Sequence, residues 1–313
     1  MASILTVTLN PALDMSTSAS HIEAAHKVRC APPRVHPGGG GINVARVLQR
    51  LGSDCLAVYP IGGSTGDRVR RLLDDEGVRS RVVQIKDETR ESFSVHESAT
   101  GLEYRFVLPG PTLEAAEWQA CLHAVSAQAP PPRFVVASGS LPPGVPTDFH
   151  ARLARLAHAH GSLFVLDSSG EALAAALKEG VHVVKPSLRE LRELTGQALA
   201  TAEQWTAAAQ RLARDGCARF VALSLGERGA VLATAERAWR ADALAVQVRS
   251  TIGAGDSFTA AFVWSLSRGE DAPTSLRHAM AAGAAAVMSP GTALCQAEEI
   301  ARLLPAVNIT EIG

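Results

Sequence analysis

The chain has 313 residues, of which 47% are hydrophobic, enough for the core of one large α/β domain or two small ones. Its formal net charge of −1 gives no electrostatic case for binding nucleic acid or an anionic membrane. The five cysteines are scattered without a CxxC pair, and no apolar run reaches about 18 residues. We therefore expect a cytoplasmic protein without a disulfide framework, a zinc site or a membrane span.

The first predicted strand covers residues 4–9, and Asp14 follows shortly after it. Residues 15–36 have no helical period. Four glycines at 38–41 then lead into a predicted helix over residues 42–51, whose apolar residues fall on one face. Because glycine is costly to order, we interpret this loop as a place where a ligand approaches the backbone, and a flexible linker is the alternative. Asn43 in the first turn is suited either to a ligand hydroxyl or to capping the helix.

The next part of the chain contains a predicted hairpin. Two segments of alternating apolar and polar residues, 92–97 and 102–107, flank a turn at 99–101. Together with residues 15–36 they interrupt an otherwise alternating β/α pattern. We expect these segments to form a small separate sheet, whose apolar residues Phe93, Val95 and Phe106 need a cover that two strands alone do not provide.

From residue 114 onward, apolar strands and helices alternate regularly, which predicts a parallel sheet covered on both faces. Polar residues follow several of these strands, at Ser138–Ser140, Asp167, Lys185 and residues 224–226. Asp14 is expected to join them. In such sheets ligands bind beyond the carboxyl ends of the strands, so this common placement predicts one binding edge.

The segment around Asp256 is the predicted reaction centre. Two glycines, Gly253 and Gly255, precede the carboxylate, and an apolar helical run follows it. Backbone N–H groups at a helix N-terminus bind anions, and a carboxylate beside them is placed to accept a proton from an attacking hydroxyl. The alternative is a glycine turn in which Asp256 is an ordinary N-cap.

Six motifs occur in order along the chain: GGGGINVAR (38–46), SGSLPPGV (138–145), DSSGEAL (167–173), Lys185-Pro186 with Glu190, SLGERG (224–229) and TIGAGD (251–256). Together they resemble the PfkB or ribokinase-like sugar kinases over nearly the whole chain. The resemblance implies one kinase domain over residues 1–313, an αβα sandwich with a mostly parallel sheet. It also implies a small β-sheet lid inserted from about 15–36 and 88–109, and a homodimer clasped through that lid.

The resemblance also implies roles for individual residues. The catalytic group comprises Asp256 as general base and an anion hole of Gly253, Ala254 and Gly255. Sugar-phosphate contacts fall on Asp14, Gly39, Asn43, Ser140 and Arg90, with Lys27, Arg29 and Arg105 as helpers. ATP contacts fall on Lys185, Ser187, Ser224, Leu225, Gly226 and Gly229. Glu190 and Asp167 would organise Mg²⁺ through water, and Ser250, Ile252, Ala286, Ser289 and Gly291 match a loop that binds a monovalent cation such as K⁺.

Within the family, the motifs resemble the minor 6-phosphofructokinases, which implies transfer from ATP to the C1 hydroxyl of fructose 6-phosphate in glycolysis. Alternatives are a kinase for tagatose 6-phosphate or a 1-phosphofructokinase, which usually has lysine where this chain has Gly40. A non-catalytic sugar-phosphate sensor is a further alternative, against which the presence of Asp256 argues. One departure from the family is Ser187, where asparagine usually stands, because serine has a shorter reach and no amide.

Overall fold

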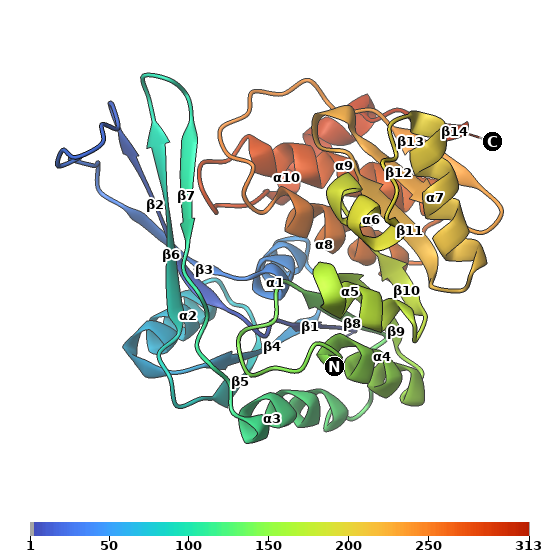
Figure 1. Cartoon of the computed structure of the whole chain (residues 1–313), viewed down its shortest axis with the longest axis horizontal. Coiled ribbons are helices and arrows are strands. Elements are labelled where there is room, and N and C mark those ends of the chain that lie inside the picture. The colour runs from blue at the N-terminus through green and yellow to red at the C-terminus, as the bar shows by residue number, and fades with distance from the viewer. Residues whose placement is uncertain (1–2, 313) are drawn as a thin grey trace.

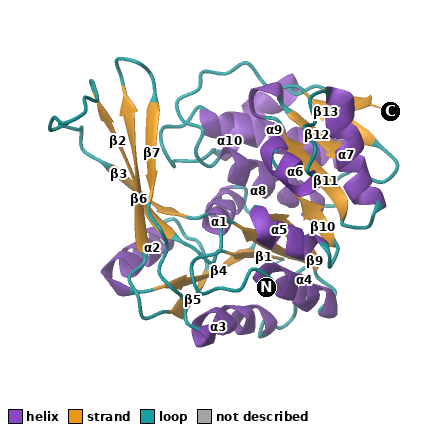
Figure 2. Ribbon diagram, viewed as in Figure 1, coloured by secondary structure: helices purple, strands orange, loops and turns teal. Residues whose placement is uncertain are grey.

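The computed structural model describes residues 3–312, and its main feature is a large sheet between two layers of helices (Figures 1 and 2). The strands are hydrogen-bonded in the order β14 (Ile309–Ile312), β13 (Ala238–Ala241), β12 (Ala230–Ala233), β11 (Ala218–Ser224), β10 (Val181–Val184), β9 (Leu163–Asp167), β8 (Phe134–Ser138), β1 (Ile4–Val7), β4 (Cys55–Ile61) and β5 (Ser80–Gln84). All pairs from β11 to β5 are parallel, and β12, β13 and β14 add antiparallel strands at one edge.

The strands are buried on both faces, which explains their continuous apolar sequences. In β8, Phe134 and Val136 face one core, while Val135 and Ala137 face the other. The helices on the first face are α1 (Gly40–Arg50), α2 (Gly63–Asp75), α8 (Ala254–Ser267), α9 (Ala272–Val287) and α10 (Ala297–Leu303). Those on the second face are α3 (Ala115–Ser126), α4 (Phe149–Ala159), α5 (Gly170–Leu177), α6 (Leu188–Thr195) and α7 (Ala202–Arg214). The predicted α/β class with a mostly parallel sheet is confirmed.

A second, smaller sheet projects from this body (Figure 1). Its strands are ordered β3 (Arg34–Gly38), β2 (Ala12–Ala19), β6 (Arg90–Glu97) and β7 (Glu103–Val107). Strands β2 and β6 are parallel, and the outer pairs are antiparallel. The predicted hairpin starts two residues earlier than expected, so Arg90 itself lies on β6.

Asp14 does not follow a strand of the main sheet, as the sequence pattern suggested, but lies inside β2 of the small sheet. It reaches the binding edge because β2 starts at Ala12, directly after the turn that ends β1. Asp167 and Ser224 are the last residues of their parallel strands, and Lys185 follows β10 immediately. These three residues therefore lie at the carboxyl ends of neighbouring parallel strands, on one side of the sheet.

Candidate active site

The turn at Gly253 starts helix α8 and gives the site its anion-binding backbone. Gly253 is the N-cap with φ of 75°, and a Cβ on it would lie 2.3 Å from the side chain of Leu294, so both conformation and space require glycine. The amides of the first helical turn, residues 254–256, have no intrahelical acceptor. The alternative that Asp256 is an ordinary N-cap is wrong, because Asp256 lies inside the first turn of the helix.

The carboxylate of Asp256 is held by two side chains from other elements. Asn43 on α1 donates from Nδ2 to Oδ2 at 2.9 Å, and Ser138 at the end of β8 donates from Oγ to Oδ1 at 3.3 Å. Burial and the nearby Asp167 raise the pKa of Asp256 to about 6, although Asn43 and Lys185 oppose the rise. The group is therefore ionised at neutral pH with a basicity well above that of an exposed aspartate, as a proton acceptor requires.

Lys185 brings a positive charge beneath the same turn. Its Nζ lies 3.1 Å from Oδ2 of Asp167, and a Cβ on Gly255 would lie 3.2 Å from that Nζ. Burial alone would lower the pKa of Lys185, but the carboxylates of Asp167, Asp256 and Glu190 raise it, so the ammonium stays charged. The site therefore combines one cation, three carboxylates and a row of backbone amides.

The glycine loop brings polar groups together within the chain. A Cβ on Gly40 would lie 2.3 Å from Oγ of Ser138, and a Cβ on Gly38 would lie 2.2 Å from Oδ2 of Asp14. Gly39 has φ of 110° and contacts Thr8. Close packing against the chain itself thus constrains these glycines, and the expected approach of a ligand to this backbone stays a prediction. The linker alternative is wrong, because α1 begins within the loop at Gly40.

The expected sugar-phosphate residues fall into two groups. Burial raises the pKa of Asp14 to about 6 against the opposing charges of Arg90, Arg105 and Arg46, so these two arginines of the small sheet, Arg90 and Arg105, lie near this carboxylate. Lys27 and Arg29 instead lie exposed in the connection between β2 and β3, at the free end of the small sheet (Figure 1). The four cations that the sequence pattern grouped together therefore do not form one cluster within a single chain.

Arg90 is half-buried at the base of the small sheet. It donates to the carbonyl of Leu108 at 3.1 Å and to that of Asn10 at 3.1 Å. Its Nε is buried and has no hydrogen-bond partner among the described residues. A neighbouring residue of the expected set, Ser140, accepts a hydrogen bond from Asn10 at 3.1 Å. A guanidinium that is held in place in this way is suited to bind a phosphate group.

On the nucleotide side, Ser187 and Glu190 form a capping box at the start of α6. Ser187 Oγ accepts from the amide of Glu190 at 3.2 Å, and Glu190 Oε2 accepts from the amide of Ser187 at 2.8 Å. The serine that departs from the family pattern thus has a local structural role. Its backbone is bridged to Ser224, and a tight turn from Ser224 through Gly226 to Gly229 follows. Leu225 has its side chain in the core, so only its backbone faces a ligand.

Two adjacent loops hold the residues expected to bind a monovalent cation. The amides of Arg249 and Ser250 donate to the carbonyl of Val287, which joins residues 249–252 to the loop after α9. Ser250 Oγ donates to Glu103 of β7 at 3.1 Å and accepts from the amide of Ile252. The remaining expected residues are Ala286, whose carbonyl accepts from the amide of Ser289, and Gly291, which packs closely against Ser16 of β2.

No group of three or more His, Cys, Asp or Glu side chains suited to a metal occurs within residues 3–312. The expected Mg²⁺ does not require such a group, because it is usually held by one or two carboxylates together with substrate phosphates and water. Asp167 and Glu190 supply two such carboxylates, and both lie near enough to Lys185 to raise its pKa. In the same described range, no helix has the length and apolar character needed to cross a membrane.

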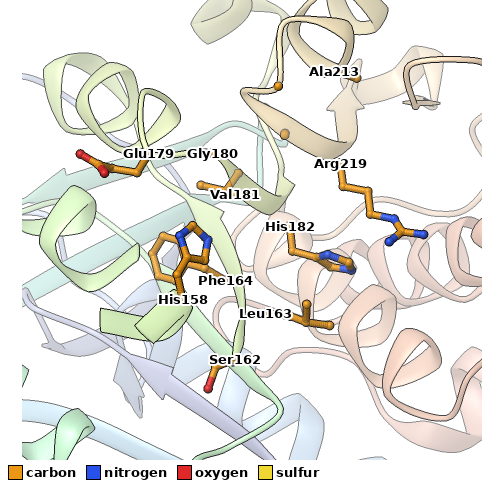
Figure 3. A pocket seen from close by; sticks show the side chains of 12 residues that line it. His158, Ser162, Leu163, Phe164, Glu179, Gly180, Val181, His182, Ala213 and Arg219 are labelled. Atoms are coloured by element: carbon orange, nitrogen blue, oxygen red, sulfur yellow. The ribbon is translucent and has the colours of Figure 1, made fainter. Parts of the chain in front are cut away.

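A pocket of about 410 Å³ lies at the amino ends of the parallel strands, on the side of the sheet opposite the candidate site (Figure 3). It is lined by the first residues of β9, β10 and β11, together with His158, His182 and Arg219. Burial and the nearby arginines Arg219 and Arg133 lower the pKa of His182 to about 4, so this ring is neutral. The pocket has none of the carboxylates that converge at the other edge, and we do not assign the reaction to it.

The structure adds two residues that the sequence pattern did not identify and defines the contact of a third. Ser138, which the sequence pattern placed at the end of its strand together with Ser140, donates to Asp256. Thr259, one turn after the reaction centre, donates to Asp167 at 3.4 Å. Arg46 is fully buried behind Asn43. Spacing on α8 and α1 could have suggested the last two, since residues three or four apart share one helix face.

Comparisons with known proteins cover nearly the whole chain. The family model described as pfkB family carbohydrate kinase matches residues 10–299. The ATP-dependent 6-phosphofructokinase isozyme 2 of Mycobacterium tuberculosis is 45% identical over 99% of this chain and 91% of its own length. The isozyme 2 of Escherichia coli is 38% identical over 97% and 98%. The crystal structure of phosphofructokinase-2 from E. coli in complex with fructose 6-phosphate has a TM-score of 0.91, at 37% identity over 98% of this chain and 99% of that chain.

Proposed function

The chain belongs to the pfkB family of carbohydrate kinases, and we propose that it is an ATP-dependent 6-phosphofructokinase. The observation that carries the proposal is the setting of Asp256, between the side chains of Asn43 and Ser138 and beside the open amides of the Gly253 turn. A proton acceptor beside an anion-binding turn suits the attack of a hydroxyl on a phosphoryl group.

The reaction is a direct in-line transfer. The C1 hydroxyl of fructose 6-phosphate gives its proton to Asp256 while its oxygen forms a bond to the γ-phosphorus of ATP. The bond from that phosphorus to the bridging oxygen breaks, and ADP leaves with the electron pair. The amides of residues 254–256 and the ammonium of Lys185 stabilise the charge that spreads over the transferred group. No covalent enzyme intermediate is required.

The turn at residues 224–229 would hold ATP, and Lys185 would interact with its phosphates. Asp167 and Glu190 would hold Mg²⁺ through water molecules. Bound Mg²⁺ would neutralise and orient the phosphates of ATP. Glu190 can take this part while it caps α6, because Oε2 accepts the amide of Ser187 and Oε1 has no such role in the capping box.

The 6-phosphate is recognised at the base of the small sheet, which we propose is a lid over the sugar. Arg90 and Arg105, which both act on the charge of Asp14, carry the positive charge at this end. Lys27 and Arg29 lie too far along the lid to join them within one chain, but they are available to a neighbouring subunit. A solved structure of phosphofructokinase-2 from E. coli is described as a tetrameric inhibited form.

We extend the proposal to a homodimer in which two lids cover each other. On the face of the lid that carries Phe93 and Phe106, these rings stack with centroids 4.6 Å apart and remain 39% and 47% exposed. Tyr104 on the same strand is also exposed. Neighbouring exposed aromatic side chains on an open sheet favour burial in an interface.

A monovalent cation such as K⁺ completes the proposal. A structure of phosphofructokinase-2 from E. coli is described as a complex with potassium. In this chain, residues 249–252 are joined to the end of α9 through the carbonyl of Val287, and they lead directly into the Gly253 turn. An ion bound by their carbonyl oxygens would stabilise the geometry of that turn.

Initial rates of ADP release with purified protein test the proposal. The panel comprises fructose 6-phosphate, tagatose 6-phosphate and fructose 1-phosphate at saturating MgATP, with Asp256→Asn as the blank. We expect the highest kcat/KM with fructose 6-phosphate. A preference for fructose 1-phosphate would favour a 1-phosphofructokinase, and sugar-phosphate binding without ADP release would favour the sensor.

A further inference from the structure

Arg46 on α1 is a charged residue with no exposed surface on its side chain. Its Nε donates to Glu76 at 2.9 Å, and its Nη2 donates to the same carboxylate at 2.7 Å. Its Nη1 lies 3.1 Å from the carbonyl of Pro37, 3.2 Å from that of Thr292 and 3.4 Å from Oδ1 of Asn43. A guanidinium is stable in such a place only when its donors are satisfied, and here every nitrogen has an acceptor.

Glu76 connects this guanidinium to a second arginine. It follows the last residue of α2, and its side chain is 27% exposed. Besides Arg46, it accepts a hydrogen bond from Arg50 at 3.3 Å. Arg50 lies one turn further along α1 and donates to the carbonyls of Ala293 and Cys295 at 2.7 and 3.0 Å. One carboxylate thus orients two arginines that together hold the backbone of residues 292–295.

The contact from Arg46 decides which way the amide of Asn43 points. An amide group has an oxygen that accepts and a nitrogen that donates. Because Oδ1 of Asn43 faces the guanidinium, Nδ2 is turned toward Oδ2 of Asp256, to which it donates at 2.9 Å. The reversed amide would place a donor against a cation and an acceptor against a carboxylate. Arg46 therefore selects the amide orientation that stabilises the ionised carboxylate of Asp256.

The segment held by the two arginines supports the other half of the site. Leu294 is buried, and its backbone has φ of 60°. Residues other than glycine rarely adopt this conformation unless their surroundings enforce it. Its side chain fills the space beside Gly253 that a Cβ would need. In Figure 1, α1 lies beside α8, so the arginines of one helix act on the N-terminal turn of the other.

We propose that Arg46, oriented by Glu76, is the positioning residue of the reaction centre: it fixes the amide of Asn43 and thereby the protonation and direction of the Asp256 carboxylate. The inference rests on the proposed function only in naming Asp256 as the base. Arg46 does not itself face the substrate, since its donors are all directed to the protein.

Glu76→Gln tests the proposal, because it removes the charge that orients Arg46 and leaves the shape. We expect kcat to fall roughly 10- to 100-fold, as for a small displacement of a catalytic group, while the KM for ATP changes little. The acidic limb of the pH profile of kcat/KM should move upward by about one pH unit, since one hydrogen bond to a charged group is worth about that much. Arg46→Lys should give the same shift, because lysine keeps the charge without the fork.

Glu179→Gln is the matched control. Glu179 forms an ion pair with Arg155, and its side chain is 28% exposed. It lies beside the pocket at the amino ends of the parallel strands, away from the site (Figure 3). We expect it to leave kcat and the pH profile unchanged. A Glu76→Gln or Arg46→Lys protein with an unmoved acidic limb would overturn the proposal, because a purely structural role lowers stability without changing the pKa of Asp256.

The two variants also keep the inference separate from the proposed function. If the parent does not phosphorylate fructose 6-phosphate, the proposed function fails. The pKa of Asp256 can still be measured in each variant from the pH dependence of the unfolding free energy of the protein and its Asp256→Asn partner. A rise of that pKa in Arg46→Lys supports the inference without any substrate, and an unchanged pKa contradicts it. If Glu76→Gln does not fold, Arg46→Lys alone decides.

Discussion

Replacing Asp256 by asparagine separates the contribution of this carboxylate to catalysis from its effect on stability. Asparagine keeps the shape and can still accept a hydrogen bond from Asn43, but it cannot take a proton at neutral pH. We expect turnover to fall by roughly 10²–10⁴-fold, the usual contribution of a general base. The binding of both substrates should be largely retained, because neither the Gly253 turn nor Lys185 is altered.

The same substitution should stabilise the fold at pH 8. The pKa of Asp256 rises from 3.8 to about 6 on folding, so the folded state favours the protonated form. The stabilisation from this preference is complete below pH 3.8 and is lost as the pH rises through 6, which means that the ionised carboxylate weakens the fold above pH 6. A shift of that size corresponds to at most roughly 3 kcal/mol, and we expect about 1–2 kcal/mol because the residue is only partly buried.

Urea unfolding of the parent and of Asp256→Asn at pH 8 and pH 5 measures this difference. The gain in unfolding free energy should be present at pH 8 and much smaller at pH 5. Asp215→Asn is the control, since Asp215 forms an exposed pair with Arg211 far from the site. Turnover of Asp256→Asn within a few-fold of the parent would refute the assignment of Asp256 as the general base. A loss of stability at pH 8 would refute the raised pKa of its carboxylate.

Three further outcomes follow from the geometry. Arg90→Ala should lower kcat/KM for fructose 6-phosphate by an amount equivalent to about 2–4 kcal/mol of transition-state free energy, with the KM for ATP nearly unchanged. An equal loss toward fructose would mean that Arg90 supports the lid and does not bind the phosphate. Glu190→Gln should raise the Mg²⁺ concentration needed for half-maximal rate. Thermal stability should not change, because glutamine still caps α6. An unchanged Mg²⁺ titration would show that Glu190 is not part of the metal site. Phe106→Glu should convert a dimer into monomers in sedimentation at micromolar concentration, and a parent that is already a fully active monomer would contradict the dimer.

The sequence predicts the sheet and the binding edge well, because both follow from local patterns. Strands buried on both faces read as apolar runs, and polar residues that follow such runs must meet at one edge of a parallel sheet. Asp167, Lys185 and Ser224 were placed correctly at that edge by this argument alone. Asp14 was not, since a short turn transfers it to a second sheet and no pattern in the sequence marks the change.

Contacts between distant segments set the limit of the sequence argument. From the sequence, Arg46 looks like an ordinary charged residue of an amphipathic helix. Its burial is explained by Glu76, thirty positions away, and by the carbonyls of Pro37 and Thr292. The glycines of the loop predict a ligand site, but their sequence does not reveal that two of them pack closely against Ser138 and Asp14. The positions of Lys27 and Arg29 could not be derived, because the length of an irregular connection does not determine its direction.

The measurement that tests the central claim most directly is the identification of the product. The protein is incubated with MgATP and either fructose 6-phosphate or fructose, and the phosphorylated sugar is analysed by ³¹P NMR while ADP is quantified. The account predicts fructose 1,6-bisphosphate in a one-to-one ratio with ADP, and a far higher kcat/KM for fructose 6-phosphate than for fructose. A phosphate on a hydroxyl other than C1, or comparable kcat/KM for the two sugars, would contradict it.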